Sequence, residues 1–129
     1  MPGPGELSVG IDVVDLGRFK DLLERHGERA KSRFFTPYER NYCEGWKGGE
    51  FACFAGKFAA KEAFLKALGT GLASGIRWKD IEVRNDERGA PHLKLEGRAL
   101  SLLGSRKVAV SISHSRSTAV AVSLIFPPH

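Results

Sequence analysis

Apolar residues recur with helical spacing between Phe51 and Leu68, and this stretch predicts the longest helix of the chain. Alanine and leucine dominate it, no proline interrupts it, and Gly69 follows at a position suited to a left-handed C-terminal cap. At about 100° per residue, one stripe of the helix is apolar and consists of Phe51, Ala55, Phe58 and Leu65. This helix is the element around which we expect the fold to be organised.

Glu62 falls on the same apolar stripe, and a carboxylate there needs a partner because burying it unpaired is costly. One interpretation is an exposed glutamate paired with Lys66 four residues on, which is a common surface arrangement. The other is a carboxylate on the wall of a cleft, where a cation, a metal or a proton compensates it. The flanking Phe58 and Leu65 favour the second interpretation.

The other predicted elements follow in this order: a strand over 7–12, a helix capped by Asp15, a helix from Thr36 to about Cys43, the long helix, a hairpin over 81–95, a short helix over 99–103 and a hairpin over 108–125. In the first strand, Leu7, Val9 and Ile11 alternate with polar or small residues, which predicts one buried apolar face. Thr36 and Glu39 can form a capping box at the start of their helix.

These elements predict an α+β fold in which helices pack on one side of a largely antiparallel sheet. The 129 residues and 42% hydrophobic content suit one domain over 1–129, with residues 1–6 as a flexible lead. No apolar run is long enough to span a membrane, and we expect no secretory leader. Cys43 and Cys53 match neither a disulfide framework nor a zinc-ligand pattern, so we expect both to be reduced in a cytoplasmic protein.

The net charge of +5 makes an anionic partner plausible, whether nucleic acid, nucleotide or acidic protein. The chain has no long basic run and no known nucleic-acid-binding motif. The helix after Asp15 carries several basic residues on one face, namely Arg18, Lys20, Arg25 and Arg29. Pattern alone favours a solvated helix face there, with a docking patch for an acidic partner as the alternative.

Two further features carry weak signals of their own. The glycine-rich segment from Gly69 to Gly75 lets a backbone approach a ligand, but Gly69-Thr-Gly71 is equally a helix stop, and no Walker phosphate loop is present. His114 stands at the tip of a strand, where a lone histidine is more often an ordinary turn residue than a catalytic base.

Several segments, in order from about Leu7 to Leu124, resemble holo-acyl-carrier-protein synthase, the small bacterial class of 4′-phosphopantetheinyl transferase. The segments that carry this resemblance are Val9-Gly-Ile-Asp12 with Arg18 six residues on, Phe35-Thr-Pro-Tyr-Glu39, Lys57-Phe-Ala-Ala-Lys-Glu-Ala-Phe-Leu-Lys66, Gly69-Thr-Gly71 and Val110-Ser-Ile-Ser-His114. The acidic residue after Gly-Ile and the Lys-Glu-x-x-x-Lys helix are the family's defining pair.

The resemblance implies transfer of 4′-phosphopantetheine from coenzyme A to a serine of apo acyl carrier protein, in support of fatty acid biosynthesis. Adenosine 3′,5′-bisphosphate would be the other product, and Mg²⁺ would be required. It also implies a homotrimer with active sites between subunits, and neither nucleic acid nor membrane as a partner.

The resemblance further assigns roles to individual residues. Asp12 and Glu62 would bind the metal, and Lys66 would join them in catalysis. Coenzyme A would bind to Lys57, Lys66, Gly69, Thr70, Gly71, Pro91 and His114. The acidic carrier protein would dock on Arg18, Arg25 and Arg29. Lys57 stands where the family more often has arginine, so the charge is kept and the fork geometry is lost.

Two other classes of protein remain as alternatives. A small basic nucleic-acid-binding domain would bind DNA or RNA in a salt-sensitive way and would make no use of Glu62 or a metal. A catalytically silent trimeric module would bind coenzyme A without transferring any part of it. Because Asp12, Glu62 and Lys66 are all present, we rank the silent module well below the transferase.

Overall fold

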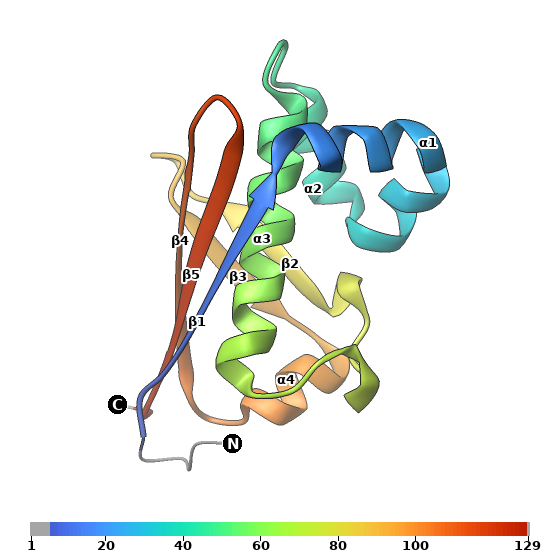
Figure 1. Ribbon diagram of the computed structural model, residues 1–129. Coiled ribbons are helices and arrows are strands. Elements are labelled where there is room, and N and C mark those ends of the chain that lie inside the picture. The colour runs from blue at the N-terminus through green and yellow to red at the C-terminus, as the bar shows by residue number, and fades with distance from the viewer. Residues whose placement is uncertain (1–5, 129) are drawn as a thin grey trace.

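The computed structural model describes residues 6–128, so the expected flexible lead lies outside the described residues except for Glu6 (Figure 1). The helices are α1 (Leu16–Phe34), α2 (Pro37–Glu44), α3 (Glu50–Leu68) and α4 (Gly97–Leu103), with short 3₁₀ helices η1 (Leu72–Ser74) and η2 (Trp78–Asp80). The strands are β1 (Ser8–Asp15), β2 (Ile81–Asn85), β3 (Pro91–Leu95), β4 (Lys107–His114) and β5 (Thr118–Phe126). The predicted α+β fold and the order of its elements are confirmed.

The helix α3 lies at the centre of the molecule and is buried on nearly every side (Figure 1). The sequence predicted one apolar stripe, but the structure also buries alanines that lie outside this stripe. Two lysines, Lys57 and Lys61, are buried as well. Gly69 ends the helix in the left-handed conformation, with φ 82° and ψ 17°, as expected. Among the described residues, no helix is both long and apolar enough to cross a membrane.

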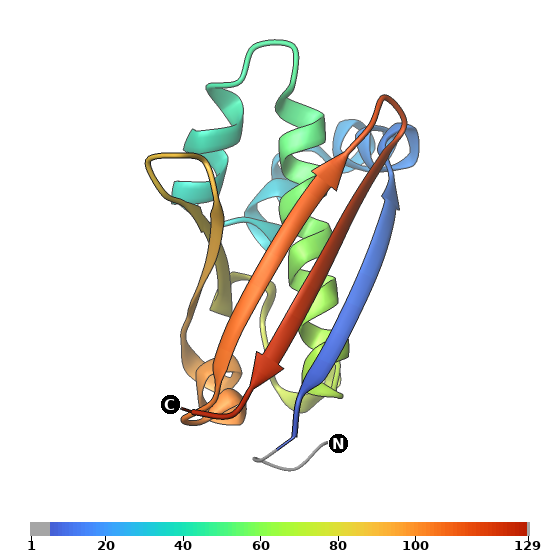
Figure 2. The same ribbon diagram turned by 90° about the vertical axis from the view of Figure 1, so that its left-hand side faces the viewer.

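The strands form two antiparallel sheets rather than the single sheet that the sequence predicted. One sheet has the order β1-β5-β4 and lies along α3, and the other is the β2–β3 hairpin (Figure 2). β3 packs beside β4, but within residues 6–128 no hydrogen-bonded ladder joins the two sheets. The two sheets and α1 therefore surround the central helix.

A glycine lets β1 lie directly on α3. A Cβ atom at Gly10 would collide with the backbone of Ala63 and of Ala67. No other residue fits without moving the strand away from the helix. This close approach brings the next polar position of β1, Asp12, against the same side of α3 that carries Glu62 and Lys66.

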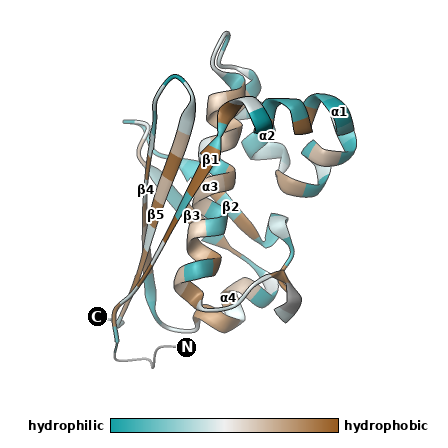
Figure 3. Cartoon of the chain, viewed as in Figure 1, coloured by the Kyte–Doolittle hydropathy of each residue, from teal (hydrophilic) through white to brown (hydrophobic). Residues whose placement is uncertain are grey.

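The apolar side of β1 faces outward, so the prediction that this side is buried was wrong. Leu7, Val9, Ile11 and Val13 are each more than half exposed, whereas Gly10 is buried against α3. The strand register sets Val9, Ile11 and Val13 opposite three apolar residues of β5, namely Leu124, Val122 and Val120. Together these seven residues form what we call the outward face, which runs along the apolar bands of β1 and β5 in Figure 3.

A buried ion pair joins α2, α3 and β2. Lys61 Nζ lies 2.8 Å from Glu39 Oε1, and both side chains are 0% exposed. Glu39 also accepts from the backbone N–H groups of Thr36 and Val83, and Lys61 also donates to the carbonyls of Phe34 and Trp78. The predicted capping box between Thr36 and Glu39 is confirmed, and its glutamate is also the buried partner of Lys61.

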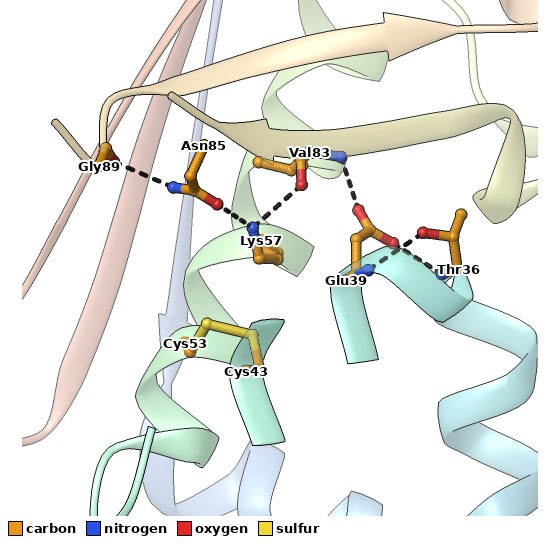
Figure 4. Close-up of a disulfide and its surroundings, with 8 residues drawn as sticks. All are labelled: Thr36, Glu39, Cys43, Cys53, Lys57, Val83, Asn85 and Gly89. Atoms are coloured by element: carbon orange, nitrogen blue, oxygen red, sulfur yellow. Dashed lines mark hydrogen bonds between the residues drawn. A yellow bond between two sulfur atoms is a disulfide. The ribbon is translucent and has the colours of Figure 1, made fainter. Parts of the chain in front are cut away.

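Cys43 and Cys53 form a disulfide, which contradicts the expectation of two reduced thiols (Figure 4). Cys43 lies near the end of α2 and Cys53 in the first turn of α3. Ten positions of sequence separate them, yet the helix–loop–helix turn brings their Cα atoms to 5.4 Å, a spacing typical of disulfides. Sequence spacing alone did not reveal this proximity.

Candidate functional site

Asp12 and Glu62 line one cavity of about 340 Å³, although they lie far apart in the sequence. Asp12 comes from β1 and Glu62 from α3, and the close approach of these two elements at Gly10 places them on a common wall. Arg18 of α1 lines the same cavity, with apolar walls from Phe19, Leu22 and Phe58. We call it the carboxylate cavity.

The two carboxylates of this cavity repel one another. Burial raises the pKa of Glu62 above its ordinary value, the negative charge of Asp12 raises it further, and Lys66 opposes both effects. Lys66 Nζ donates to Asp12 Oδ1 at 3.0 Å and to the carbonyl of Ile11 at 3.1 Å. Within residues 6–128, the ion pair of Lys66 is therefore with Asp12 and not with Glu62, so the exposed i, i+4 pair is not formed.

The residues of the carboxylate cavity fit a divalent cation bound together with a substrate. Mg²⁺ in proteins is commonly held by one or two carboxylates, and substrate phosphates and water complete its octahedron. Asp12 and Glu62 supply two carboxylates, and their mutual repulsion favours a cation between them. Within the described residues no group of three or more acidic, histidine or cysteine side chains gathers to hold a metal. The protein alone would thus provide a partial site.

A second cavity, of about 350 Å³, opens between α2, α3, the β2–β3 turn and β4. It brings together three residues that the resemblance assigned to coenzyme A, namely Lys57, Pro91 and His114. Its remaining walls include Tyr42, Trp46, Cys53, Asn85, Arg88 and Gly89. We call it the α2–α3 cavity, and it shares no lining residue with the carboxylate cavity.

Lys57 is held by protein groups at the edge of the α2–α3 cavity. Its Nζ donates to the carbonyl of Val83 at 3.0 Å and to Asn85 Oδ1 at 2.6 Å (Figure 4). It also lies 4.6 Å from the centre of the Tyr42 ring. Burial lowers the pKa of Lys57 to about 8, although the negative charge of Glu39 opposes this effect. Sequence reasoning found Lys57 but not its partner Asn85.

The aromatic wall of the α2–α3 cavity also escaped sequence reasoning. Tyr42 and Trp46 line the cavity, and Tyr38 stacks behind Tyr42; the three follow one another at intervals of four residues, and neighbouring rings lie 6.4 Å and 5.9 Å apart. The spacing of Tyr38 and Tyr42 places both on one face of α2, and Trp46 follows just beyond the end of that helix, so the four-residue spacing was a usable signal. Trp46 is 48% exposed at the mouth of the cavity.

The glycine-rich segment lies at the opposite end of α3 from the α2–α3 cavity. Gly69 caps the helix through N–H bonds to the carbonyls of Leu65 and Lys66, and Thr70 Oγ1 is hydrogen-bonded to Ser74 Oγ. Gly71 precedes η1 in an extended conformation. Gly69, Thr70 and Gly71 line neither of the two cavities, but they begin within one helical turn of Lys66.

The three arginines predicted to dock a carrier protein are spread along α1. Arg18 lines the carboxylate cavity and Arg25 is exposed. Gly27, with φ 55° and ψ −132°, interrupts the helix, and Arg29 lies beyond it in a separate hollow. The basic face is therefore bent, and the structure brings only Arg18 next to the carboxylates.

Comparison with known proteins identifies the family of this chain. Residues 8–122 match the model of the 4′-phosphopantetheinyl transferase superfamily. A holo-[acyl-carrier-protein] synthase from Halothermothrix orenii is 47% identical over 116 residues, covering 88% of this chain and 91% of the relative. One from Geobacter sulfurreducens is 48% identical over 122 residues, covering 92% and 96%.

Solved structures of the same kind superpose on this chain. The Bacillus anthracis holo-(acyl-carrier-protein) synthase in complex with CoA (3′,5′-ADP) has a TM-score of 0.79 and 39% identity, covering 93% of this chain and 96% of that one. The Helicobacter pylori enzyme in complex with coenzyme A has a TM-score of 0.81 and 29% identity, covering 91% and 98%. The chain therefore belongs to the 4′-phosphopantetheinyl transferase superfamily, within its holo-[acyl-carrier-protein] synthase family.

Proposed function

We propose that this chain transfers 4′-phosphopantetheine from coenzyme A to a serine of apo acyl carrier protein and releases adenosine 3′,5′-bisphosphate. The observation that carries the proposal is the convergence of Asp12 and Glu62 on one cavity, with Lys66 bonded to Asp12. The family membership and the coenzyme A complexes of two relatives support it. The proposal includes a role in fatty acid biosynthesis in the cytoplasm, as the resemblance implies.

Displacement at phosphorus depends on positioning and on neutralising charge more than on covalent help from the protein. Lys66 would bind a phosphate oxygen of coenzyme A as a point charge, since more than half of its side chain is exposed beside Asp12. Asp12 and Glu62 would hold Mg²⁺, which when bound neutralises negative charge on the diphosphate. Arg18, on the rim of the same cavity, would hold the acidic carrier protein close to the reacting phosphate.

The α2–α3 cavity would take the nucleotide end of coenzyme A. Arg88 and His114 supply basic groups for its phosphate, Lys57 lines the wall from α3, and Trp46 and Tyr42 offer aromatic surface for its base. Coenzyme A carries a purine and several phosphates, so a basic cavity with an aromatic wall suits its chemistry. In this proposal Lys57, Pro91 and His114 keep the coenzyme A-binding role that the resemblance implies, and the role is specified as binding of the nucleotide end.

We further propose that the protein is a homotrimer with active sites between subunits. The outward face is a continuous apolar surface on the three-stranded sheet, and such surfaces in small proteins commonly mark interfaces. The carboxylate cavity and the α2–α3 cavity have no common wall within one chain. One copy would supply the carboxylates and its neighbour the α2–α3 cavity.

The direct test is the mass of an apo acyl carrier protein after incubation with this protein, coenzyme A and Mg²⁺. A gain of about 340 Da by covalent addition, abolished by a chelator and by Glu62→Gln, would support the transferase and its metal requirement together. Binding of coenzyme A by a folded sample without any gain would favour the silent module. Salt-sensitive binding of DNA or RNA, with no binding of coenzyme A, would favour the nucleic-acid-binding alternative.

A further inference from the structure

We propose that Asn85 is a positioning residue that ties the β2–β3 turn to Lys57 and thereby sets the wall against which the nucleotide of coenzyme A binds. This inference rests on the proposed function, because it takes the α2–α3 cavity as the nucleotide site. Asn85 is the last residue of β2 and pairs with Pro91, the first residue of β3, so it stands where the hairpin enters its turn.

The side chain of Asn85 bridges two groups that have no direct contact of their own. Its Oδ1 accepts from Lys57 Nζ at 2.6 Å, and its Nδ2 donates to the carbonyl of Gly89 at 3.0 Å (Figure 4). An ammonium can only donate and a carbonyl can only accept, so these two partners fix the orientation of the amide. The bridge therefore requires both ends of an asparagine.

The backbone of Asn85 is anchored separately. Its N–H donates to Tyr38 Oη at 3.2 Å, and Tyr38 Oη donates to its carbonyl at 3.4 Å. Beyond this anchor, Asp86 Oδ1 accepts from the N–H groups of Arg88 and Ala90 and orders the rest of the turn. The side chain of Asn85 thus adds the link between the turn and α3, on which Lys57 lies.

The turn that Asn85 holds forms one wall of the cavity. Arg88, Gly89 and Pro91 line it from the hairpin, and Lys57 lines it from α3. Lys57 is only 2% exposed and already has Val83 and Asn85 as acceptors. We therefore infer that Lys57 acts on the nucleotide largely by holding the hairpin in place, and that Asn85 transmits this effect.

The experiment measures binding of adenosine 3′,5′-bisphosphate by calorimetry, together with the KM for coenzyme A and kcat, in the full chain. Asn85→Leu removes both ends of the bridge and keeps the number and branching of the side-chain heavy atoms. It should weaken binding of adenosine 3′,5′-bisphosphate and raise the KM for coenzyme A, each about tenfold, with kcat changed by less than about twofold. Asn85→Asp keeps the acceptor for Lys57 and loses the donor to Gly89, so its effect should be intermediate.

Glu87→Gln is the matched control, because Glu87 is an exposed residue of the same turn that does not line the cavity. It should leave the affinity for adenosine 3′,5′-bisphosphate and the KM for coenzyme A unchanged. If Asn85→Leu does not fold, as judged by circular dichroism, Asn85→Asp and Asn85→Ser carry the test. Unchanged affinities in the folded Asn85 variants would overturn the positioning role.

A double-mutant cycle with Lys57→Met separates positioning from direct contact. If Asn85 and Lys57 act as one unit, the double variant should bind adenosine 3′,5′-bisphosphate no more weakly than the weaker single variant. Losses that multiply independently would overturn the link between the two residues. A wild-type protein that binds neither adenosine 3′,5′-bisphosphate nor coenzyme A would instead refute the proposed function itself.

Discussion

Lys66 and Asp12 are joined by an ion pair between α3 and β1, in which Nζ lies 3.0 Å from Oδ1. The lysine side chain is 54% exposed, and the side chain of Asp12, which lines the carboxylate cavity, is 15% exposed. Its partial exposure makes it a weak contributor to stability, because solvent screens such pairs. We therefore expect this ion pair to matter for catalysis more than for stability.

Lys66→Met tests this separation of roles. We expect kcat for carrier-protein modification to fall by about 100-fold or more, since the charge that we propose binds the reacting phosphate is lost. The free energy of unfolding should change by no more than about 1 kcal/mol. Lys94→Met, which removes an exposed lysine of β3, is the control and should alter neither quantity. A kcat near that of the wild type would remove Lys66 from the proposed mechanism.

Arg18→Glu addresses recognition of the carrier protein. The KM for the carrier protein should rise at least tenfold, because an acidic partner would meet a reversed charge beside the carboxylate cavity. Affinity for coenzyme A should stay unchanged in calorimetry. Lys94→Glu makes the same charge change on β3 and serves as the comparison. Equal losses of both affinities would count against a docking role for Arg18.

Ile11→Glu tests the role of the outward face. We expect the wild type to elute in size-exclusion chromatography with light scattering at about three times the 14.1 kDa chain mass. The variant should elute as a folded monomer, because a charge buried in an apolar interface is costly. Glu24→Gln, on the exposed side of α1, should leave the wild-type mass unchanged. A monomeric wild type at micromolar concentration would contradict the proposed assembly.

The same assembly makes a prediction about mixtures of inactive chains. Asp12→Asn alters the carboxylate cavity, and His114→Ala alters the α2–α3 cavity. A homotrimer of either variant should therefore have low transferase activity. Mixed trimers would contain some sites with both halves intact, and activity should reappear after co-refolding. The measurement is the rate of carrier-protein modification per chain. A mixture that is no more active than its components would contradict the proposal that each active site combines cavities from two subunits.

The pKa of Lys57 predicts a stability change at alkaline pH. Burial lowers this pKa from the ordinary 10.5 to about 8, so between these values the unfolded chain holds a proton that the folded chain has released. The free energy of unfolding must then rise with pH across this window, by an upper limit of about 3 kcal/mol. Below pH 8 both states are protonated and the contribution is constant.

Urea denaturation at pH 7, 8, 9 and 10 measures this effect. The difference in unfolding free energy between wild type and Lys57→Met should shift in favour of the wild type as the pH rises from 8 to 10. A difference that is constant with pH would mean that Lys57 titrates near its ordinary value.

The disulfide between Cys43 and Cys53 should contribute to stability by closing the loop that joins α2 and α3. For a loop of this size, reduction or the double change Cys43→Ala/Cys53→Ala should lower the free energy of unfolding by about 2–3 kcal/mol. Wild-type protein with and without dithiothreitol, compared by thermal melting, gives the measurement. The double variant controls for direct effects of the reductant, and equal melting temperatures would refute the contribution.

Sequence patterns predicted the features of the fold that depend on neighbouring residues. The capping box at Thr36 and Glu39 and the left-handed stop at Gly69 are local, and both are present. The alternation in β1 correctly predicted a strand, but alternation is symmetrical and does not say which side meets the core. Gly10 decides that question, because only a residue without a side chain fits between β1 and α3.

The chemistry of the candidate site was less visible in the sequence. The family resemblance assigned Asp12 and Glu62 to one metal site, and the structure brings both to one cavity. Asn85 escaped notice because its role depends on two partners, one of them on a distant helix. The disulfide escaped for the same reason, since its two halves meet only after α2 and α3 have packed together.

The pair formed by Glu39 and Lys61 has a consequence for how mutational scans of this protein would be interpreted. Removing either partner alone leaves an unpaired charge in the core, which costs about 3–5 kcal/mol. A scan that alters one position at a time would therefore score both as intolerant, alongside Asp12 and Glu62. Replacing both together by apolar residues of similar volume is often tolerated. Only a library of paired changes would separate the residues that the fold needs from those that we propose act on the substrate.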